Sequence, residues 1–229
     1  MASDQAGLKR AVADAAAALI ESGMRVGLGT GSTADLFVEA LARRISAGEI
    51  ENLRFTATSK RTEELAARLG LECADLGSLG ELSMTVDGAD EIDPELRLIK
   101  GLGGALLREK IVAQASSRMV VIADESKLVH ALGRGVLPVE VVRFAIDRMQ
   151  LVLAKMELDS VLRRSSNSEP FLTDEHHYIL DVDVPAGQVA EIATELKTIA
   201  GVVETGYFGD EATEALIGSA TGVRHISRP

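Results

Sequence analysis

The stretch Met24-Arg25-Val26-Gly27-Leu28-Gly29-Thr30-Gly31-Ser32-Thr33 decides the expected fold. Met24 to Leu28 is apolar and predicts a short strand, and the glycine-rich turn after it predicts the start of a helix from Thr33 to Ser46. Glycines let the backbone approach a ligand closely, and amide groups at a helix start favour an anion. The same pattern is also typical of a tight turn with Ser or Thr as N-cap, so both interpretations stay open.

Two nucleotide-binding motifs fit this turn poorly. A dinucleotide fingerprint requires a third glycine where Ser32 stands and an acidic residue after the second strand, where this chain has Thr58-Ser59-Lys60. A Walker loop requires a Gly-Lys-Ser/Thr ending, which the turn lacks. The nucleotide interpretation is therefore weak.

Helical and strand patterns alternate outward from this turn. The expected elements are a helix over 5–21, strands over 24–28, 53–57, 83–86 and 119–123, and helices over 33–46, over 60–69 and after Gly104. Such alternation predicts an α/β fold, with a Rossmann-like, mostly parallel sheet covered by helices.

The rhythm changes after Gly135. Strands are expected over 136–142, near Val161, and over 178–184 and 202–208, with helices over 146–156 and 188–199. This βαββαβ order is the ferredoxin-like α+β pattern. A final apolar segment over 215–226 should return to the first domain. We therefore expect a catalytic domain of residues 1–135 plus 209–229 and an inserted smaller domain of residues 136–208.

Bulk properties restrict the class of protein. Hydrophobic residues make up 46% of the 229 residues and charged residues 26%, a globular balance. The net charge of −11 disfavours nucleic acid or an anionic membrane as the main partner. No apolar run is long enough to cross a bilayer, and Asp14 interrupts the alanine-rich start. Cys73 is the only cysteine, so we expect a reducing, cytoplasmic location.

An acidic turn, Asp87-Gly88-Ala89-Asp90-Glu91-Ile92-Asp93, follows the strand over 83–86. Open parallel sheets bind their ligands at this end of their strands. Acidic turns are also commonly Asx-turns or helix caps, and this alternative stays open. A metal site is less favoured, because none of the four histidines lies near the turn in sequence.

A lysine and a glutamate follow closely. Lys100 precedes a flexible glycine-containing loop, Gly101 to Gly104, and Glu109 lies on the helix after it. Glu109 taken alone is most simply a solvated helix residue, and Lys127 an exposed loop lysine. Together with the acidic turn, however, these residue types suit proton transfer beside a stabilised negative charge.

The motifs in their order closely resemble ribose-5-phosphate isomerase, type A, over nearly the whole chain. The matching pieces are Gly29-Thr30-Gly31-Ser32-Thr33, Thr58-Ser59, Asp87-Gly88-Ala89-Asp90-Glu91-Ile92, Lys100-Gly101 through Arg108-Glu109-Lys110-Ile111, Ala123-Asp124 with Ser126-Lys127, Leu137-Pro138-Val139-Glu140-Val141, Thr173-Asp174, Ile179-Leu180-Asp181 and Gly201-Val202-Val203.

This resemblance implies the interconversion of ribose 5-phosphate and ribulose 5-phosphate through an enediolate, in the non-oxidative pentose phosphate pathway, without metal or organic cofactor. It implies that Glu109 is the base and that Asp87, Asp90 and Lys100 are also catalytic. It further implies a homodimer, formed through the second domain. The implied contacts with the pentose 5-phosphate are Thr30, Gly31, Ser32, Thr33, Asp87, Gly88, Ala89, Asp90, Lys100, Gly101, Leu102, Gly103 and Lys127. Whether Lys9, Lys100 or Lys127 holds the phosphate stays open.

The chain departs from the family pattern at Leu102, Leu107 and Asp174-Glu175-His176-His177, none of which is a proposed catalytic residue. Two alternatives remain. One is a sugar-phosphate deaminase or lactonase of related fold, against which the segment from Lys100 to Glu109 argues. The other is a sugar-phosphate-binding module that has lost its chemistry, which the retention of Glu109 disfavours.

Overall fold

The structure, a computed structural model, describes residues 2–228 and divides into two compact units. The first unit consists of the chain up to Ala89, Arg108–Leu128, and the chain from Asp210 on. The second consists of Asp90–Leu107 and Val129–Gly209. This division differs from the domain limits expected from the sequence, because residues 90–107 and 129–135 cluster with the second unit.

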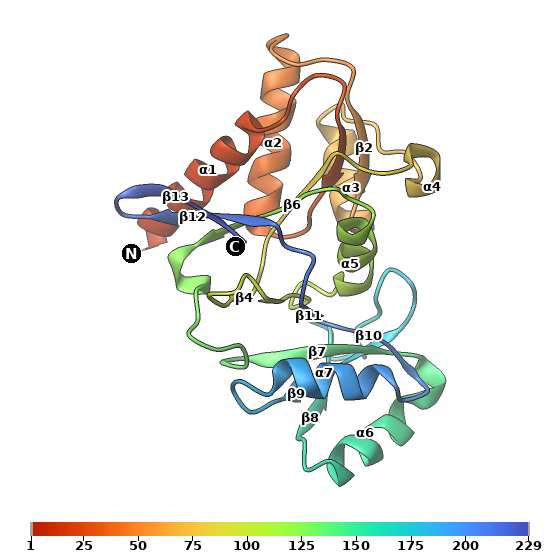
Figure 1. Cartoon of the computed structure of the whole chain (residues 1–229). Helices are drawn as coiled ribbons and strands as arrows, with labels where there is room; N and C mark the ends of the chain where they lie inside the picture. The colour runs from red at the N-terminus through yellow and green to blue at the C-terminus, as the bar shows by residue number, and fades with distance from the viewer. Residues whose placement is uncertain (1, 229) are drawn as a thin grey trace. The chain divides into compact units, whose positions relative to one another are not determined.

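The first unit is built on a six-stranded sheet of order β13-β12-β6-β3-β1-β2 (Figure 1). All neighbouring strands are parallel except β12 and β13, which form an antiparallel hairpin. The strands are β1 (Arg25–Leu28), β2 (Arg54–Ala57), β3 (Met84–Asp87), β6 (Met119–Asp124), β12 (Glu214–Ser219) and β13 (Gly222–Ser227). The helices are α1 (Ala2–Ala18), α2 (Ser32–Ser46), α3 (Lys60–Arg68), α4 (Leu76–Leu79) and α5 (Leu106–Gln114), and a 3-10 turn, η1 (Glu125–Lys127), follows β6. The first two residues of α5 are assigned to the second unit and the rest to the first. The predicted mostly parallel sheet is confirmed.

The central strands of this sheet are buried along their whole length. Every residue of β3 and β6 is buried, as expected for parallel strands covered on both faces. The alanine-rich helix α1 packs against α2, and its buried residues Val12, Ala13 and Ala16 join Phe37 of α2 in one core. Truncating Phe37 to Ala would cost about 3–5 kcal/mol. Among the described residues, no helix is both long and apolar enough to cross a membrane.

The second unit contains the predicted βαββαβ pattern. Its elements are β7 (Val136–Val141), the 3-10 turn η2 (Arg143–Ala145), α6 (Ile146–Lys155), β8 (Ser160–Leu162), β9 (Tyr178–Asp183), α7 (Val189–Lys197) and β10 (Val202–Thr205). The sheet order is β10-β7-β9-β8, with all neighbours antiparallel. One face of this sheet and both helices form a single core, to which β7 contributes Leu137, Val139 and Val141. Because side chains alternate along a strand, Pro138 and Glu140 face the opposite side.

The predicted single strand over 202–208 is wrong, because the chain changes sheets at Gly206. Beyond Gly206, β11 (Tyr207–Phe208) pairs with β5 (Leu98–Ile99), which in turn pairs with β4 (Glu91–Ile92). The cause is a close backbone approach, since a Cβ atom on Gly206 would lie 2.2 Å from the carbonyl oxygen of Lys100. This three-stranded sheet is also why residues 90–107 belong to the second unit.

Candidate functional site

The glycine-rich turn of the first unit begins the helix α2 without a side-chain cap. The N-cap residue is Gly31, so the alternative of Ser or Thr as N-cap is wrong. The Asp35 amide donates to the Gly31 carbonyl oxygen (2.8 Å), which starts the helical hydrogen-bond pattern. Ser32 is exposed at this end of the helix, and Thr33 lies buried beside it. An uncapped helix start of this kind suits an anionic ligand.

A cluster of hydroxyl groups from the segment after β2 holds the glycine-rich turn in place. The Thr30 hydroxyl lies within hydrogen-bond distance of the hydroxyls of Thr58 (2.7 Å), Ser59 (2.7 Å) and Thr62 (3.0 Å). The Thr62 hydroxyl in turn donates to the carbonyl oxygen of Gly29 (3.1 Å). Ser59 is also the N-cap of α3, where it accepts the Thr62 amide (3.1 Å). The hydroxyl of Thr30 therefore positions the turn.

Asp87 links the turn to the end of β3. Its Oδ1 atom accepts the backbone amides of Thr30 (2.9 Å) and Gly88 (2.7 Å), and the residue is completely buried. The chains approach so closely that a Cβ atom on Gly29 would lie 2.5 Å from the Asp87 Cα atom. The structure thus brings the predicted residues Thr30, Asp87 and Gly88 together in one place.

A second charged group lies at the same helix start. The Lys9 ammonium group of α1 donates to the Ser32 hydroxyl (3.0 Å). Lys9 also lies within electrostatic reach of Asp124, at the end of β6. Burial works to raise the pKa of Asp124, but hydrogen bonds from Ser126 and Gln5 and the charge of Lys9 together hold it below its usual value. The sequence left open whether Lys9, Lys100 or Lys127 holds the phosphate, because nothing in the helical pattern of α1 distinguishes Lys9 from a solvated lysine. Of the three, Lys9 is the one whose ammonium group is seen to donate to Ser32.

The segment after β6 carries the predicted residue Lys127. Asp124 caps the 3-10 turn η1 by accepting the Ser126 amide (3.0 Å), and Lys127 closes that turn in a partly buried position. Lys127 therefore lies just beyond the end of β6, at the edge of the sheet where the sequence placed it.

Glu109 lies on α5 and is buried, with 5% of its surface exposed. The interpretation of Glu109 as a solvated helix residue is therefore wrong. A buried carboxylate carries a large desolvation cost, and such groups gather at functional sites. Sequence periodicity could not reveal this burial, because α5 is only weakly amphipathic and charged residues are usually exposed.

In the second unit, the loop after β5 carries Lys100 in a buried position, with 2% of its surface exposed. Its amide donates to the Gly206 carbonyl oxygen (2.8 Å), and its ammonium group lies 5.6 Å from the centre of the Phe208 ring. The Leu102 amide donates to Oδ2 of Asp90 (2.9 Å). The structure therefore brings the predicted residues Asp90 and Leu102 together, and Asp90 caps the loop.

The remaining acids of the acidic turn are structural. Glu91 accepts the amides of Gly133 (2.8 Å), Arg134 (3.3 Å) and Gly135 (2.6 Å). Asp93 forms an Asx-type turn with the amides of Glu95 and Arg97 and pairs with the Arg97 guanidinium group. For Asp93 the simple turn interpretation is right, whereas Glu91 holds a distant segment of the chain.

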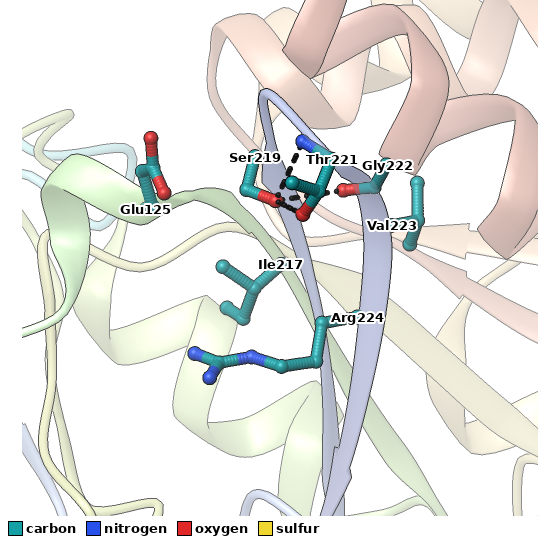
Figure 2. A pocket seen from close by; sticks show the side chains of 7 residues that line it. All are labelled: Glu125, Ile217, Ser219, Thr221, Gly222, Val223 and Arg224. Atoms are coloured by element: carbon teal, nitrogen blue, oxygen red, sulfur yellow. Dashed lines mark hydrogen bonds between the residues drawn. The ribbon is translucent and has the colours of Figure 1, made fainter.

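A pocket of about 290 Å³ lies elsewhere in the first unit, at the β12–β13 hairpin (Figure 2). Ser219 and Thr221 lie hydrogen-bonded at the hairpin tip, and Glu125 reaches the pocket from η1. None of the predicted site residues, all of which the structure describes, lines this pocket. Between residues 2 and 228 we also find no group of three His, Cys, Asp or Glu side chains placed to hold a metal ion.

Comparison with known proteins identifies the family. The family model of ribose 5-phosphate isomerase A (phosphoriboisomerase A) matches residues 54–222. The ribose-5-phosphate isomerase A of Sinorhizobium fredii is 46% identical over 226 residues, covering 96% of this chain and 97% of the relative. The enzyme of the same name from a Synechococcus species is 48% identical over 224 residues, covering 96% of each chain.

Solved structures agree with these relatives. A D-ribose-5-phosphate isomerase in complex with phospho-erythronic acid matches with a TM-score of 0.93 and 35% identity, covering 97% of this chain and 98% of the solved chain. Ribose 5-phosphate isomerase A from Methanocaldococcus jannaschii matches with a TM-score of 0.91 and 36% identity, covering 96% and 98%. These matches do not favour a related deaminase, lactonase or binding module. The chain belongs to the ribose 5-phosphate isomerase A family, and it is an isomerase that interconverts ribose 5-phosphate and ribulose 5-phosphate.

Proposed function

We propose that Glu109 is the base of this isomerisation. In the aldose-to-ketose direction it removes the proton from C2, and the electron pair forms the enediolate between C1 and C2. The proton of the C2 hydroxyl passes to the C1 oxygen, and Glu109 then delivers its proton to C1, which leaves a carbonyl at C2. One carboxylate can serve both carbons because they are adjacent. The observation that supports this role most strongly is the burial of Glu109, since a buried carboxylate is unusual away from functional sites.

Lys100 is the group that offsets the charge of the enediolate oxygen. A buried ammonium group acts in a less polar medium than water, where its attraction to a developing negative charge is stronger. Asp90 positions the loop after Lys100 and, with Asp87, assists the opening of the furanose ring. These roles rest on the family resemblance together with the hydrogen bonds of Asp87 and Asp90.

The phosphate group binds at the start of α2. Ser32, Thr33 and the amides of the first helical turn supply donors, and Lys9 and Lys127 supply positive charge. Two observations support this placement. Helix α2 has no side-chain cap, and Lys9 already donates to the Ser32 hydroxyl at that end. Because the whole chain carries a net charge of −11, a dianionic phosphate needs such local positive charge.

We further propose a homodimer in the cytoplasm. Phe144 is fully exposed and Leu151 on the adjacent helix α6 is 61% exposed, which makes this part of the second unit suitable for a contact with a second copy. Size-exclusion chromatography with light scattering tests this, and Phe144→Ser with Leu151→Ser should shift the protein towards the monomer. An unchanged mass in the double variant would exclude this surface.

The decisive experiment follows ribulose 5-phosphate formation from ribose 5-phosphate in the presence of EDTA. We expect full activity, because the proposed mechanism uses no metal; loss of activity on chelation would contradict it. Glu109→Gln should lower kcat by at least about 10³-fold, in the range expected when a general base is removed. Glu195→Gln, an exposed helix glutamate on α7, is the matched control and should leave kcat unchanged.

Binding must be measured separately from turnover. Phospho-erythronic acid, which is bound in the solved relative, should inhibit this enzyme competitively and should still bind the Glu109→Gln variant in calorimetry. Near-normal turnover in Glu109→Gln would remove Glu109 from its role as base. Loss of both binding and turnover would show instead that the variant has lost the site.

A further inference from the structure

The loop that follows Lys100 is not held in place by burial of its side chains. Leu102 is 53% exposed and Gly103 is exposed as well. Gly101 and Gly104 at its two ends are buried, but the exposed tip gains little from the hydrophobic effect, and its ordering cost of about 1–2 kcal/mol per residue must be offset by other contacts. Gly101 packs close to Leu106 and Gly104 close to Phe171, whereas the contacts of Leu102 are polar and come from one arginine and one aspartate.

Arg163 follows strand β8, and its guanidinium group reaches the backbone of this loop. Its Nη1 atom donates to the carbonyl oxygens of Gly101 (2.6 Å) and Leu102 (3.2 Å). Its Nε atom donates to Oδ2 of Asp181 on β9 (2.9 Å), and Nη2 donates to the other carboxylate oxygen. Only 12% of the Arg163 side chain is exposed. The guanidinium group therefore binds two carbonyls on one side and both oxygens of a carboxylate on the other.

This arrangement holds the loop from two sides. Arg163 fixes the carbonyl oxygen of Leu102, while Asp90 accepts the amide of the same residue (2.9 Å). Charge-assisted hydrogen bonds are roughly twice as strong as neutral ones, and the planar guanidinium fixes direction as well as distance. Asp181 orients the guanidinium group and balances its charge, which makes its burial tolerable.

We propose that Arg163 is a positioning residue for the isomerase reaction. By holding the carbonyl oxygens of Gly101 and Leu102, it keeps the loop closed behind Lys100 and keeps the Lys100 ammonium group where the enediolate oxygen forms. The inference rests on the proposed role of Lys100. Arg163 itself touches neither substrate nor reacting atoms in this assignment, and Asp181 acts only through Arg163.

The test uses Arg163→Lys and Arg163→Ala in the full-length enzyme. A lysine keeps the positive charge near Asp181 but cannot bind both carbonyls and both carboxylate oxygens at once. We expect kcat to fall about 10- to 100-fold in both variants, while KM changes by no more than about 3-fold, because a misplaced charge is felt mainly in the transition state. Arg164→Ala is the matched control, because Arg164 is exposed and its guanidinium group donates to the Ser168 carbonyl oxygen, four residues away, and not to the loop after Lys100.

Two further readouts separate positioning from general stability. Guanidinium chloride at low millimolar concentration should restore part of the kcat of Arg163→Ala in a saturable way and leave the wild type unchanged. Hydrogen exchange at the amides of residues 101–104 should be at least about 10-fold faster in Arg163→Lys than in the wild type. If Arg163→Ala fails to fold, Arg163→Lys decides the question alone.

A normal kcat together with normal exchange in Arg163→Lys would overturn the positioning role. A fall in kcat of the same size in Arg164→Ala would overturn it too, since any lost arginine would then suffice. Wild-type enzyme that does not turn over ribose 5-phosphate would overturn the proposed function and the positioning role together. Active wild type with an unaffected Arg163→Lys variant would overturn the positioning role only.

Discussion

The turn Gly29 to Thr33 in the first unit and the loop Lys100 to Gly104 in the second are both glycine-rich, and both are proposed to contact the substrate. They are held in different ways. Neutral buried hydroxyls and Asp87 hold the turn, and the backbone of β3 packs directly against it. The loop is held by charged groups, Arg163 and Asp90, and the Leu102 side chain is mostly exposed.

The turn and the loop therefore differ in what keeps their backbone in position for a ligand. The turn is a part of the sheet edge, and its partners are Asp87 at the end of β3 and the hydroxyl groups that follow β2 and begin α3. It is therefore as rigid as the core below it. The exposed tip of the loop depends on hydrogen bonds from two side chains, so a single substitution outside it can release it. Changes to the turn should therefore cost more stability than changes to the loop, whereas loss of the Arg163 contact should act mainly on turnover.

The largest expected effect on stability is that of Gly29→Ala. The added Cβ atom would lie 2.5 Å from the Asp87 Cα atom, and backbone of the central sheet cannot move aside cheaply. We expect a loss of about 3 kcal/mol in the free energy of unfolding, at the upper end for overpacking. Urea unfolding measures it. Gly77→Ala is the control, because a Cβ atom there meets nothing within 4 Å. Equal stability of the two variants would show that the turn is not rigid.

Gly104→Ala should cost less, about 2 kcal/mol, although its Cβ atom would lie 2.4 Å from the Phe171 ring. The far end of a ring can rotate away, and the remaining cost is the strain of a φ angle of +82°. In a Phe171→Leu background the cost of Gly104→Ala should therefore fall by about 1 kcal/mol, measured as a double-mutant cycle. A cost that is the same in both backgrounds would mean that Phe171 does not set the position of the loop.

Thr30→Val should cost about 1–2 kcal/mol, because it removes the hydroxyl at the centre of the buried cluster and leaves the hydroxyls of Thr58, Ser59 and Thr62 without it. Chemical unfolding provides the measurement. Thr221→Val, which removes a hydroxyl at an exposed hairpin, should change stability by less than about 0.5 kcal/mol. Equal free energies of unfolding for Thr30→Val and Thr221→Val would show that the hydroxyl cluster does not stabilise the turn.

The smallest effect concerns a buried carboxylate of the second unit that no backbone amide holds, in contrast to Asp87. Burial raises the pKa of Glu140, against hydrogen bonds from Thr173 and His177 that lower it. The folded protein therefore holds this proton more tightly than the unfolded chain. The resulting stability is complete below the unfolded pKa of about 4.5 and is lost as the pH rises through the folded pKa.

Glu140→Gln cannot lose a proton, so its stability relative to the wild type should increase as the pH rises from about 4.5 towards 7. Urea unfolding of both proteins at several pH values gives the difference. A constant difference across this range would show that Glu140 does not titrate separately in the folded state.

The fold was largely predictable because each unit follows a local pattern. The strand-turn-helix around Gly29 and the βαββαβ order after Gly135 are set by apolar periodicity and turn residues, and both are confirmed. The split of the strand at Gly206 was not predictable, because its cause is a contact with Lys100, about a hundred residues earlier. The short strands β4 and β5 were missed for the same reason, as two-residue strands have no periodicity.

The candidate site was predictable in residue types but not in arrangement. Asp87 and Asp90 look equivalent in sequence, yet the first accepts amides of the turn and the second caps the loop. The burial of Glu109 and the contact of Lys9 with Ser32 depend on tertiary packing that no local pattern encodes. The catalytic and binding roles of these residues stay predictions until the variants are measured.

The position of β12 has a consequence for synthesis on the ribosome. This strand pairs with β6 in the central sheet, but about ninety residues separate the two in the chain. At roughly 5–20 residues per second, the edge of β6 stays open for roughly 5–20 seconds while the second unit emerges. An open edge of a buried, apolar strand is a site for aggregation, so this interval is when the nascent chain most needs protection.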